Sequence, residues 1–337
     1  MIDIIYFDLK ITNPSLSTWI CYFMQFFRNA CFTIQKACDI LSLKNYQEVS
    51  MRSIFMRYPN GKAKAVTFSY DDGVRQDKRL AALFTEYGMK ATFNFNCEFM
   101  RGVNFTKEQI QEYFLSHGHE IAVHGANHRA NGNMRPIEGI RDVLDCRLEL
   151  EERCDRIIRG MAYPDSGITS MGNFGNYEMI KNYLTELDIA YARTLGGDNN
   201  DFLLPLDFHA WMPSAHHNNP KIMQYIDEFL ALDISTKAYH ARRMPRLLYI
   251  WGHSYEFDQN NNWEHIEAIC QKLADREDLW YATNIEICDY VQAYKRLIYS
   301  ADGHKIYNPS VLKVWLDIDG VLYSVAPGET LCLPQNL

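Results

Sequence analysis

The chain has 337 residues, of which 47% are hydrophobic and 23% charged, the balance of a globular protein with one large domain or two ordinary ones. Its formal net charge of −8 excludes a general nucleic-acid binder, because neutralising phosphates requires a basic surface. The nine cysteines are odd in number and include no C-x-x-C pair, which favours free thiols in a reducing compartment. We therefore expect a cytoplasmic protein.

The first 50 residues differ from the rest of the chain. Their apolar stretch, residues 17–41, is interrupted by polar and charged side chains before a bilayer span is complete, so we predict no transmembrane span. It also lacks the cationic start and the small-residue cleavage site of a signal peptide. An appended amphipathic helix, a membrane-surface segment and translation from upstream of the true start remain open. We interpret residues 1–50 as an N-terminal extension.

From residue 61 onward, β-rich runs alternate with helical stretches. Strands are expected at 64–70, 89–96, 119–124, 159–164, 188–194, 246–252 and 279–284, and helices at 77–88, 106–118, 140–154 and 263–275. Gly88 is typical of the residue that follows a helix, and Thr106 of a helix cap. The alternation indicates an α/β protein with a parallel sheet. The number of units favours a closed or nearly closed (β/α) barrel over an open doubly wound sheet.

The end of the chain has a different pattern. After about residue 300 it reads as a hairpin-like β tail with turns at Asp319-Gly320 and Pro327-Gly328. We therefore expect a main domain at 51–299 and a small C-terminal β extension at 300–337. The oligomeric state is left unassigned.

Ionisable residues end several of the predicted strands. The first strand ends in Asp71 and Asp72, the third in His124, and the strand at 246–252 in His253. Active residues collect at the carboxyl ends of the strands in barrels and open parallel sheets. His124 and His128 lie four residues apart, and two imidazoles with one carboxylate make a three-ligand catalytic zinc site. Asp72 is the expected third ligand, although an H-x-x-x-H spacing also arises by chance among 11 histidines.

Four stretches together resemble the ordered motifs of a known family. TFSYDDG at 67–73, HGANH at 124–128, MAYPDSG at 161–167 and LLYIWGH at 247–253 are similar to those of the polysaccharide deacetylases, carbohydrate esterase family four. The resemblance covers about residues 61–295. It implies a distorted (β/α) barrel that binds a divalent metal ion, usually zinc, and removes acetyl groups from N-acetylated sugars.

The resemblance also implies roles for single residues. Asp71 matches the general base, and Asp72, His124 and His128 match the metal ligands. His253 matches the general acid, and its ordinary pKa of ~6.5 suits protonation of a leaving nitrogen near neutral pH. A bound zinc ion would lower the pKa of its water towards ~7 and polarise the acetyl carbonyl.

The third motif departs from the family pattern. Pro164 matches the family proline, and Asp165 occupies the position whose backbone N–H helps to bind the oxyanion. Ala162 stands where the family carries an arginine that orients the catalytic aspartate. Arg193, at the end of the strand at 188–194, is our candidate replacement, and an ordinary solvated strand-end arginine is the alternative.

The stretch LDFHAWMPSAHH at 206–217 matches a further family motif loosely. Trp211 is either a sugar-stacking wall or a core tryptophan. Asp207 is a candidate hydrogen-bond partner for His253. His216 and His217 either touch substrate or a second metal, or lie in a solvated loop; His209 is also part of this stretch.

Residues near His253 are candidates for substrate contact. Glu256 either engages substrate or is a surface carboxylate, and Leu248 and Ile250 either line the acetyl-methyl pocket or belong to the strand core. The resulting hypothesis is a metal-dependent deacetylase of an N-acetylated carbohydrate. A hydrolase of a small non-sugar amide and a catalytically silent carbohydrate-binding module are the alternatives.

Overall fold

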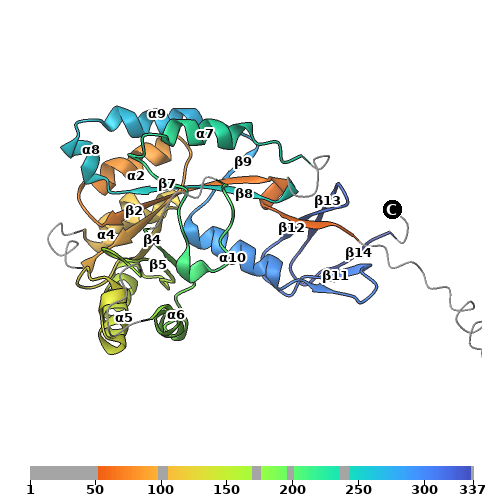
Figure 1. Ribbon diagram of the computed structural model, residues 1–337, viewed down its shortest axis with the longest axis horizontal. Coiled ribbons are helices and arrows are strands. Elements are labelled where there is room, and N and C mark those ends of the chain that lie inside the picture. Colours follow the sequence, from red (N-terminus) through yellow and green to blue (C-terminus); the bar gives the residue numbers. More distant parts are fainter. Residues whose placement is uncertain (1–51, 98–104, 169–175, 196–200, 236–242, 335–337) are drawn as a thin grey trace, which may run out of the picture. The chain divides into compact units, whose positions relative to one another are not determined.

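The computed structural model describes residues 52–97, 105–168, 176–195, 201–235 and 243–334 (Figure 1). The extension predicted for residues 1–50 lies outside the described residues. Among the helices in these ranges, none is long and apolar enough to cross a membrane.

An eight-stranded parallel sheet forms the centre of the molecule. Its order is β6 (Tyr191–Arg193), β5 (Gly160–Ala162), β4 (Glu120–Val123), β3 (Ala91–Phe95), β2 (Lys64–Asp72), β8 (Arg246–Gly252) and β7 (Ala215–His216). The eighth strand, β9 (Leu279–Tyr281), pairs with β2. The sheet is curled into an incomplete barrel, and the predicted α/β class and parallel pairing are confirmed. In a parallel sheet all the carboxyl ends meet at one edge, so residues that follow β2, β4, β6 and β8 become neighbours there.

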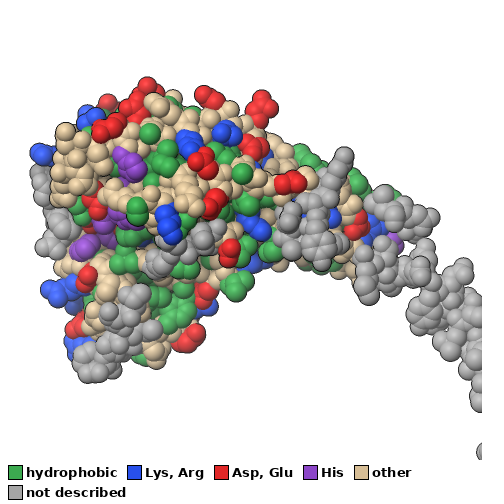
Figure 2. Space-filling model, turned by 45° about the horizontal axis from the view of Figure 1, so that its top comes forward, with side chains coloured by type: hydrophobic (Ala, Val, Ile, Leu, Met, Phe, Trp, Pro, Cys, Tyr) green, Lys and Arg blue, Asp and Glu red, His purple; other side chains and the backbone are tan. Residues whose placement is uncertain are grey.

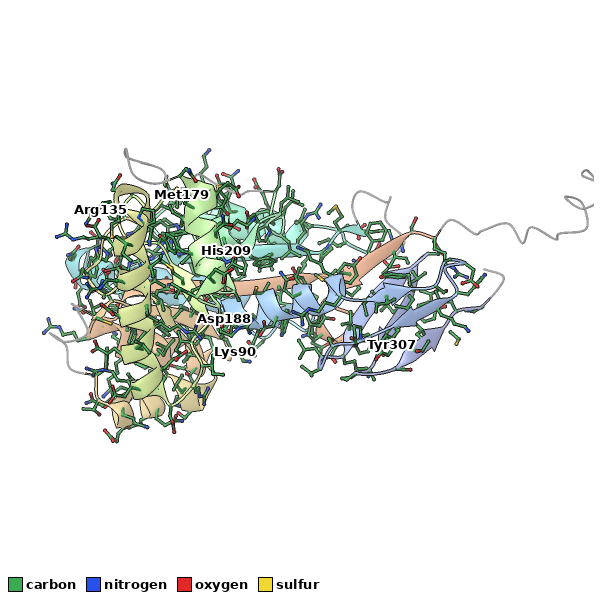
Figure 3. All side chains as sticks on the ribbon, turned by 90° about the horizontal axis from the view of Figure 1, so that it is seen from below. Lys90, Arg135, Met179, Asp188, His209 and Tyr307 are labelled. Atoms are coloured by element: carbon green, nitrogen blue, oxygen red, sulfur yellow. The ribbon has the colours of Figure 1, made fainter. Side chains whose placement is uncertain are left out.

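Helices cover the sheet. They are α2 (Gln76–Glu86), α4 (Lys107–Tyr113), α5 (Pro136–Cys154), α6 (Tyr177–Glu186), α7 (Ile222–Ala231), α8 (Tyr255–Gln259), α9 (Trp263–Leu273) and α10 (Asn284–Lys295), with short 3-10 turns at Pro59–Gly61, Leu115–His117, Asn131–Asn133 and Phe208–Ala210. The helices α2, α7 and α9 lie on one side of the sheet and α5 and α6 on the other (Figure 1). Figure 3 shows α5 and α6 side by side, with Arg135 at the start of α5 and Met179 on α6.

Two of the predicted helix boundaries are confirmed. Thr106 caps α4 and forms a capping box with Gln109. Gly88 follows α2 with a φ of 65°, a left-handed conformation that glycine adopts without a Cβ clash.

The central strands have two chemically different faces. On β2, Phe68 and Tyr70 pack on Phe84 of α2, with ring centroids 4.5 and 5.7 Å apart. Ser69 and Asp71 point the other way, and both accept hydrogen bonds from the Asn94 side-chain amide on β3. Side chains alternate along a strand, so the apolar set faces the helices and the polar set faces the barrel interior.

The C-terminal strands form two small antiparallel sheets. One consists of β1 (Ile54–Arg57), β12 (Val314–Ile318) and β13 (Val321–Val325), and the other of β10 (Ile298–Tyr299), β11 (Lys305–Tyr307) and β14 (Thr330–Cys332). The Asp319–Gly320 turn joins β12 to β13 as predicted. Tyr307 marks these strands in Figure 3. The β extension therefore pairs with β1, which precedes the barrel in the sequence.

A buried ion group holds β1 on β12. Arg57 Nη2 lies 2.6 Å from Asp317 Oδ2, and Arg243 pairs with the same carboxylate. Asp317 is 0% exposed, so its charge depends on both guanidinium groups for compensation.

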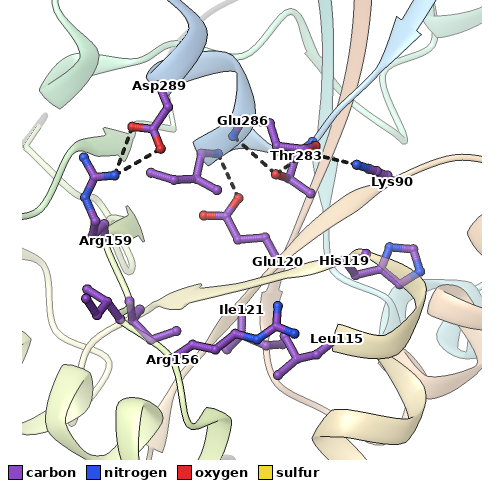
Figure 4. A pocket seen from close by; sticks show the side chains of 14 residues that line it. Lys90, Leu115, His119, Glu120, Ile121, Arg156, Arg159, Thr283, Glu286 and Asp289 are labelled. Atoms are coloured by element: carbon purple, nitrogen blue, oxygen red, sulfur yellow. Dashed lines mark hydrogen bonds and ion pairs between the residues drawn. The ribbon is translucent and has the colours of Figure 1, made fainter. Parts of the chain in front are cut away.

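A pocket of about 390 Å³ lies at the amino-terminal edge of the sheet (Figure 4). Two ion pairs lie in its wall, Lys90 with Glu286 and Arg159 with Asp289. Glu120 in its floor accepts a hydrogen bond from the Ile285 backbone, and burial raises the pKa of this carboxyl to about 7. The pocket is on the opposite edge from the strand-end residues predicted to carry chemistry.

Candidate active site

The two adjacent aspartates at the end of β2 face the same region. Strand alternation alone would send Asp72 to the face opposite Asp71. Asp72, however, has a φ of 86°, outside the extended region, which ends the alternation at the last residue of β2. His128 and Asp165 also have positive φ values, both 50°. Strained backbone conformations of this kind cluster at functional sites.

Asp72, His124 and His128 form a group with the geometry of a metal site. Asp72 Oδ1 lies 3.5 Å from His124 Nε2 and 3.3 Å from His128 Nε2. This oxygen is buried and receives no well-directed hydrogen bond from the described residues. His124 Nδ1 lies 2.9 Å from the Ala162 carbonyl oxygen and donates to it, which leaves the Nε2 lone pair facing Asp72. The donor set fits a divalent cation with an open position.

The loop that carries the two histidines is fixed by neighbouring polar groups. Asn96 at the end of β3 donates to the His124 and Gly125 carbonyls over 3.1 and 3.2 Å. Asp142 on α5 accepts hydrogen bonds from the backbone and the side chain of Asn127, both at 2.9 Å. The loop is therefore anchored on both sides between its two imidazoles.

Electrostatics favour an anionic Asp72 and a neutral His124. Burial alone would raise the pKa of the Asp72 carboxyl, but the imidazoles of His128, His124 and His253 outweigh it and lower the pKa. Burial lowers the pKa of His124, against the opposing effect of the two aspartates. A neutral imidazole and a carboxylate are the forms that bind a cation.

Asp71 lies beside this group and has its own partners. Its Oδ2 accepts a short hydrogen bond from Arg193 Nη2, and its Oδ1 accepts one from Asn94 Nδ2 at 2.9 Å. Arg193 is 0% exposed. Arg193 is the direct neighbour of Ala162 in the pairing of β5 with β6. Its guanidinium therefore reaches Asp71 from β6, at the end of the sheet order, and not from a strand that pairs with β2.

His253 follows β8 and lies at the same edge. Its Nδ1 is 3.3 Å from Glu256 Oε1, and the ring is 22% exposed. Burial would lower the pKa of His253, but Glu256, Asp71 and Asp72 outweigh it and raise the pKa. Figure 2 shows histidine side chains grouped at the left-hand end of one face of the molecule.

Comparison with known proteins bears on the resemblance predicted from the sequence. Residues 58–171, about a third of the chain, match the model described as polysaccharide deacetylase. The predicted resemblance is confirmed. A protein from Mycobacterium smegmatis assigned to the polysaccharide deacetylases is 16% identical with a TM-score of 0.50, and the match covers 71% of this chain and 94% of that one. This similarity shows a shared fold, the predicted distorted (β/α) barrel of the polysaccharide deacetylases.

Two further solved structures are similar at lower scores. The peptidoglycan deacetylase PdaC from Bacillus subtilis is 16% identical with a TM-score of 0.44, and the match covers 71% of this chain and 95% of that one. A family 4 carbohydrate esterase from Streptomyces lividans, solved with acetate, is 11% identical with a TM-score of 0.42 over 65% of this chain and 90% of that one. No curated protein matches the chain.

The third predicted motif lies next to the Asp72, His124 and His128 group. Pro164 is buried, and Asp165 follows it at the edge of a cavity of about 420 Å³ that His128 also lines. The structure thus brings Asp165 to the same cavity as His128.

The prediction that Trp211 is a sugar-stacking wall is wrong. Trp211 is 1% exposed and packs edge-on against Tyr191, Phe208 and Tyr249, at centroid distances of 5.4, 4.9 and 5.0 Å. It belongs to the apolar core of the barrel interior.

The assignment of Leu248 and Ile250 to an acetyl-methyl pocket is also wrong. Both are fully buried in the core between the sheet and its helices. Trp251 has the opposite orientation on β8 and is half-buried, with its ring centroid 4.4 Å from the Arg193 guanidinium and 5.8 Å from the His253 ring. Strand alternation decides between these neighbours, and the alternative role of Leu248 and Ile250 as strand core is the one that the structure shows.

Three residues of the 206–217 stretch also differ from their predictions. Asp207 does not contact His253, because its carboxylate binds Lys181 and Tyr177, each at 2.7 Å. His216 and His217 are not in a solvated loop. His217 is 0% exposed and stacks on Tyr70 at 5.6 Å, and His216 packs on Trp251 at 4.7 Å.

Sequence reasoning missed Asn94 and Trp251. Asn94 lies in ATFNFN, where polar residues alternate with aromatic ones on a strand next to the aspartates. That alternation is a readable signal for a polar interior face. Trp251 stands two residues before His253, and an odd–even count along β8 would have placed it on the same face.

Proposed function

We propose that this protein is a metal-dependent deacetylase that hydrolyses the N-acetyl amide of an N-acetylated carbohydrate. The observation that carries the proposal is the arrangement at the carboxyl edge of the sheet. Asp72, His124 and His128 place potential ligand atoms within 4.8 Å of one another. Asp71 lies beside them, with its Oδ2 3.9 Å from His124 Nε2. Zinc fits the donor set of one carboxylate and two imidazoles.

In this proposal the metal ion and the neighbouring side chains have separate roles in the hydrolysis. A divalent ion held by Asp72, His124 and His128 would supply an activated water and a Lewis acid for the acetyl carbonyl. Asp71, which is outside this donor set, takes the proton of the attacking water as general base. His253 donates a proton to the departing nitrogen. The backbone N–H of Asp165 helps to bind the oxyanion.

Arg193 and Asn94 orient the base. Each binds a different oxygen of the Asp71 carboxylate, so the carboxylate cannot rotate about its Cβ–Cγ bond without losing a hydrogen bond. Arg193 thus takes the place of the arginine that the family carries in the third motif, at the position of Ala162. Its guanidinium also stacks on Trp251, which we assign to the wall of the substrate site.

Acetate release tests the proposed function. We expect zinc-loaded protein to release acetate from N-acetylated glycans such as chitooligosaccharides, and a chelator to abolish the reaction until zinc is restored. Sugar binding and bound zinc without turnover would instead support a carbohydrate-binding module. Turnover of small amides alone would support a non-sugar amide hydrolase.

Replacing Arg193 tests the orientation of Asp71. In Arg193→Met we expect kcat to fall about 10-fold or more, equivalent to about 1.4 kcal/mol or more of transition-state stabilisation. Because the change leaves the buried Asp71 charge without its ion partner, we also expect the free energy of unfolding to fall by about 3–5 kcal/mol. The matched control is Arg159→Met, which breaks an exposed pair with Asp289 at 3.0 Å and should change stability little. A wild-type kcat in folded Arg193→Met protein would remove Arg193 from the proposed mechanism.

A further inference from the structure

A second cluster of ligand-type side chains lies beside His253. His216, His253 and Glu256 place potential ligand atoms within 4.8 Å of one another. His216 ends β7, His253 follows β8, and Glu256 is in α8. Two imidazoles and one carboxylate are also the donor set of a catalytic zinc site. The hydrogen bonds of each ring decide whether the cluster can bind an ion.

The hydrogen bonds of His216 disfavour metal binding. The Asn218 backbone N–H donates to His216 Nδ1 over 3.1 Å, so in the neutral ring the proton must be on Nε2. Nε2 faces Glu256 Oε2 at 3.3 Å, and burial lowers the pKa of His216 to about 4, which keeps the ring neutral near pH 7. A protonated nitrogen has no lone pair for a cation. His124 has the opposite arrangement, because its Nδ1 donates to a carbonyl and its Nε2 is left for the metal.

We propose that Glu256 is a positioning residue that holds His253 as the general acid, and that the cluster is a hydrogen-bonded network rather than a second metal site. The inference rests on the proposed function, in which His253 protonates the leaving nitrogen. The His253 Nδ1 donates to Glu256 Oε1 over 3.3 Å, which leaves Nε2 to carry the catalytic proton. The hydrogen-bond partner of His253 is therefore the residue three positions later in the chain. Asp207, the candidate partner in the sequence analysis, binds Lys181 and Tyr177 instead.

Glu256 is itself fixed from several directions. Its backbone N–H donates to the His253 carbonyl over 3.2 Å, and this hydrogen bond ties the start of α8 to His253. Its Oε2 accepts a hydrogen bond from the Asn218 side chain at 3.2 Å and lies 2.9 Å from Nε2 of His217. Gly252 leaves room for His217, since a Cβ at this position would overlap the imidazole ring. The carboxylate therefore has few alternative positions.

The charge on Glu256 persists despite partial burial. Burial would raise the pKa of Glu256, but the imidazoles of His217, His253 and His216 lower it well below its ordinary value. The groups that face His253 are Asp71 and Asp72 at the end of β2, His216 and His217 at the end of β7, and Tyr255 and Glu256 of α8. Of the three carboxylates in this set, Glu256 alone hydrogen-bonds the His253 ring among the described residues.

Kinetics of the zinc-loaded protein provide the first test. In Glu256→Gln we expect kcat to fall about 10- to 100-fold, part of the ~10²–10⁴-fold that a general acid contributes, while KM changes less than about twofold. Removing the carboxylate also lowers the pKa of His253, so the alkaline limb of the kcat profile should move to lower pH. Glu256→Asp, which keeps the charge, should restore part of the rate. Asp258→Asn is the matched control, because Asp258 is on the same helix and bonds Gln76 and Trp263 instead.

Imidazole NMR and zinc stoichiometry test the same inference without turnover. In ¹⁵N-histidine-labelled, zinc-loaded protein we expect neutral His253 to carry its proton on Nδ1, and we expect its pKa to fall in Glu256→Gln. Zinc titration should show one ion per chain. A raised KM with an unchanged kcat, an unmoved His253 pKa, or a second zinc ion lost in Glu256→Gln would each overturn the inference. If wild-type protein releases no acetate, the proposed function fails, while the NMR result still decides whether Glu256 positions His253.

Discussion

Asp71→Asn is expected to bind zinc normally and to lose about 10²–10⁴-fold in kcat, the usual contribution of a general base. The carboxamide keeps the shape of Asp71 but cannot accept the proton of the attacking water. Zinc binding should persist, because Asp71 is outside the donor set of Asp72, His124 and His128. The check is acetate release together with metal content of the same preparation.

The same substitution should also destabilise the protein. Arg193 is 0% exposed and loses its only carboxylate partner among the described residues, and breaking a buried pair costs about 3–5 kcal/mol. Assays therefore belong at a temperature where thermal unfolding shows the variant folded. Asp302→Asn, at an exposed position in the C-terminal extension, is the control. A folded Asp71→Asn protein with a near-wild-type rate would show that the assigned base is wrong.

His124→Ala is expected to lose both zinc and activity. The change removes one of three ligands, so the loss of zinc affinity should exceed the ~10–100-fold that is typical of removing an outer-shell partner. Equilibrium dialysis with metal analysis measures the affinity, and added zinc should restore little acetate release.

The control for this variant is His304→Ala, which removes a histidine near Arg52 and far along the chain from the metal ligands. It should bind one zinc ion and retain wild-type activity. Retention of tight zinc binding in His124→Ala would place the metal elsewhere and would contradict the proposed donor set.

The position of the site could be predicted from the sequence. The carboxyl ends of the strands share one edge of any parallel sheet. Three β-rich runs of this sequence are followed there by candidate site residues, namely Asp71-Asp72, HGANH and His253. Strand alternation with helices predicted that sheet, and the caps at Gly88 and Thr106 depend on local backbone geometry alone. The strands, helices and caps depend on residues that are near one another in the sequence, so they can be predicted from the sequence pattern.

The orientation of the side chains depended on tertiary structure. Asp72 joins Asp71 on one side only because its φ is 86°. Arg193 reaches Asp71 because β6 is in register with β5, which places it beside Ala162. Neither the backbone angle nor the register is encoded within a few residues.

Trp211 and Trp251 also show that the exposure of a side chain depends on the tertiary structure. Both are tryptophans near predicted strand ends, yet Trp211 is 1% exposed in the core and Trp251 is half-buried beside Arg193 and His253. The sequence by itself determined the sheet, the edge at which the candidate catalytic residues lie, and the adjacent aspartates that mark it. The tertiary structure alone decided which neighbouring side chains share a face, because their packing depends on contacts between strands that are distant in the chain.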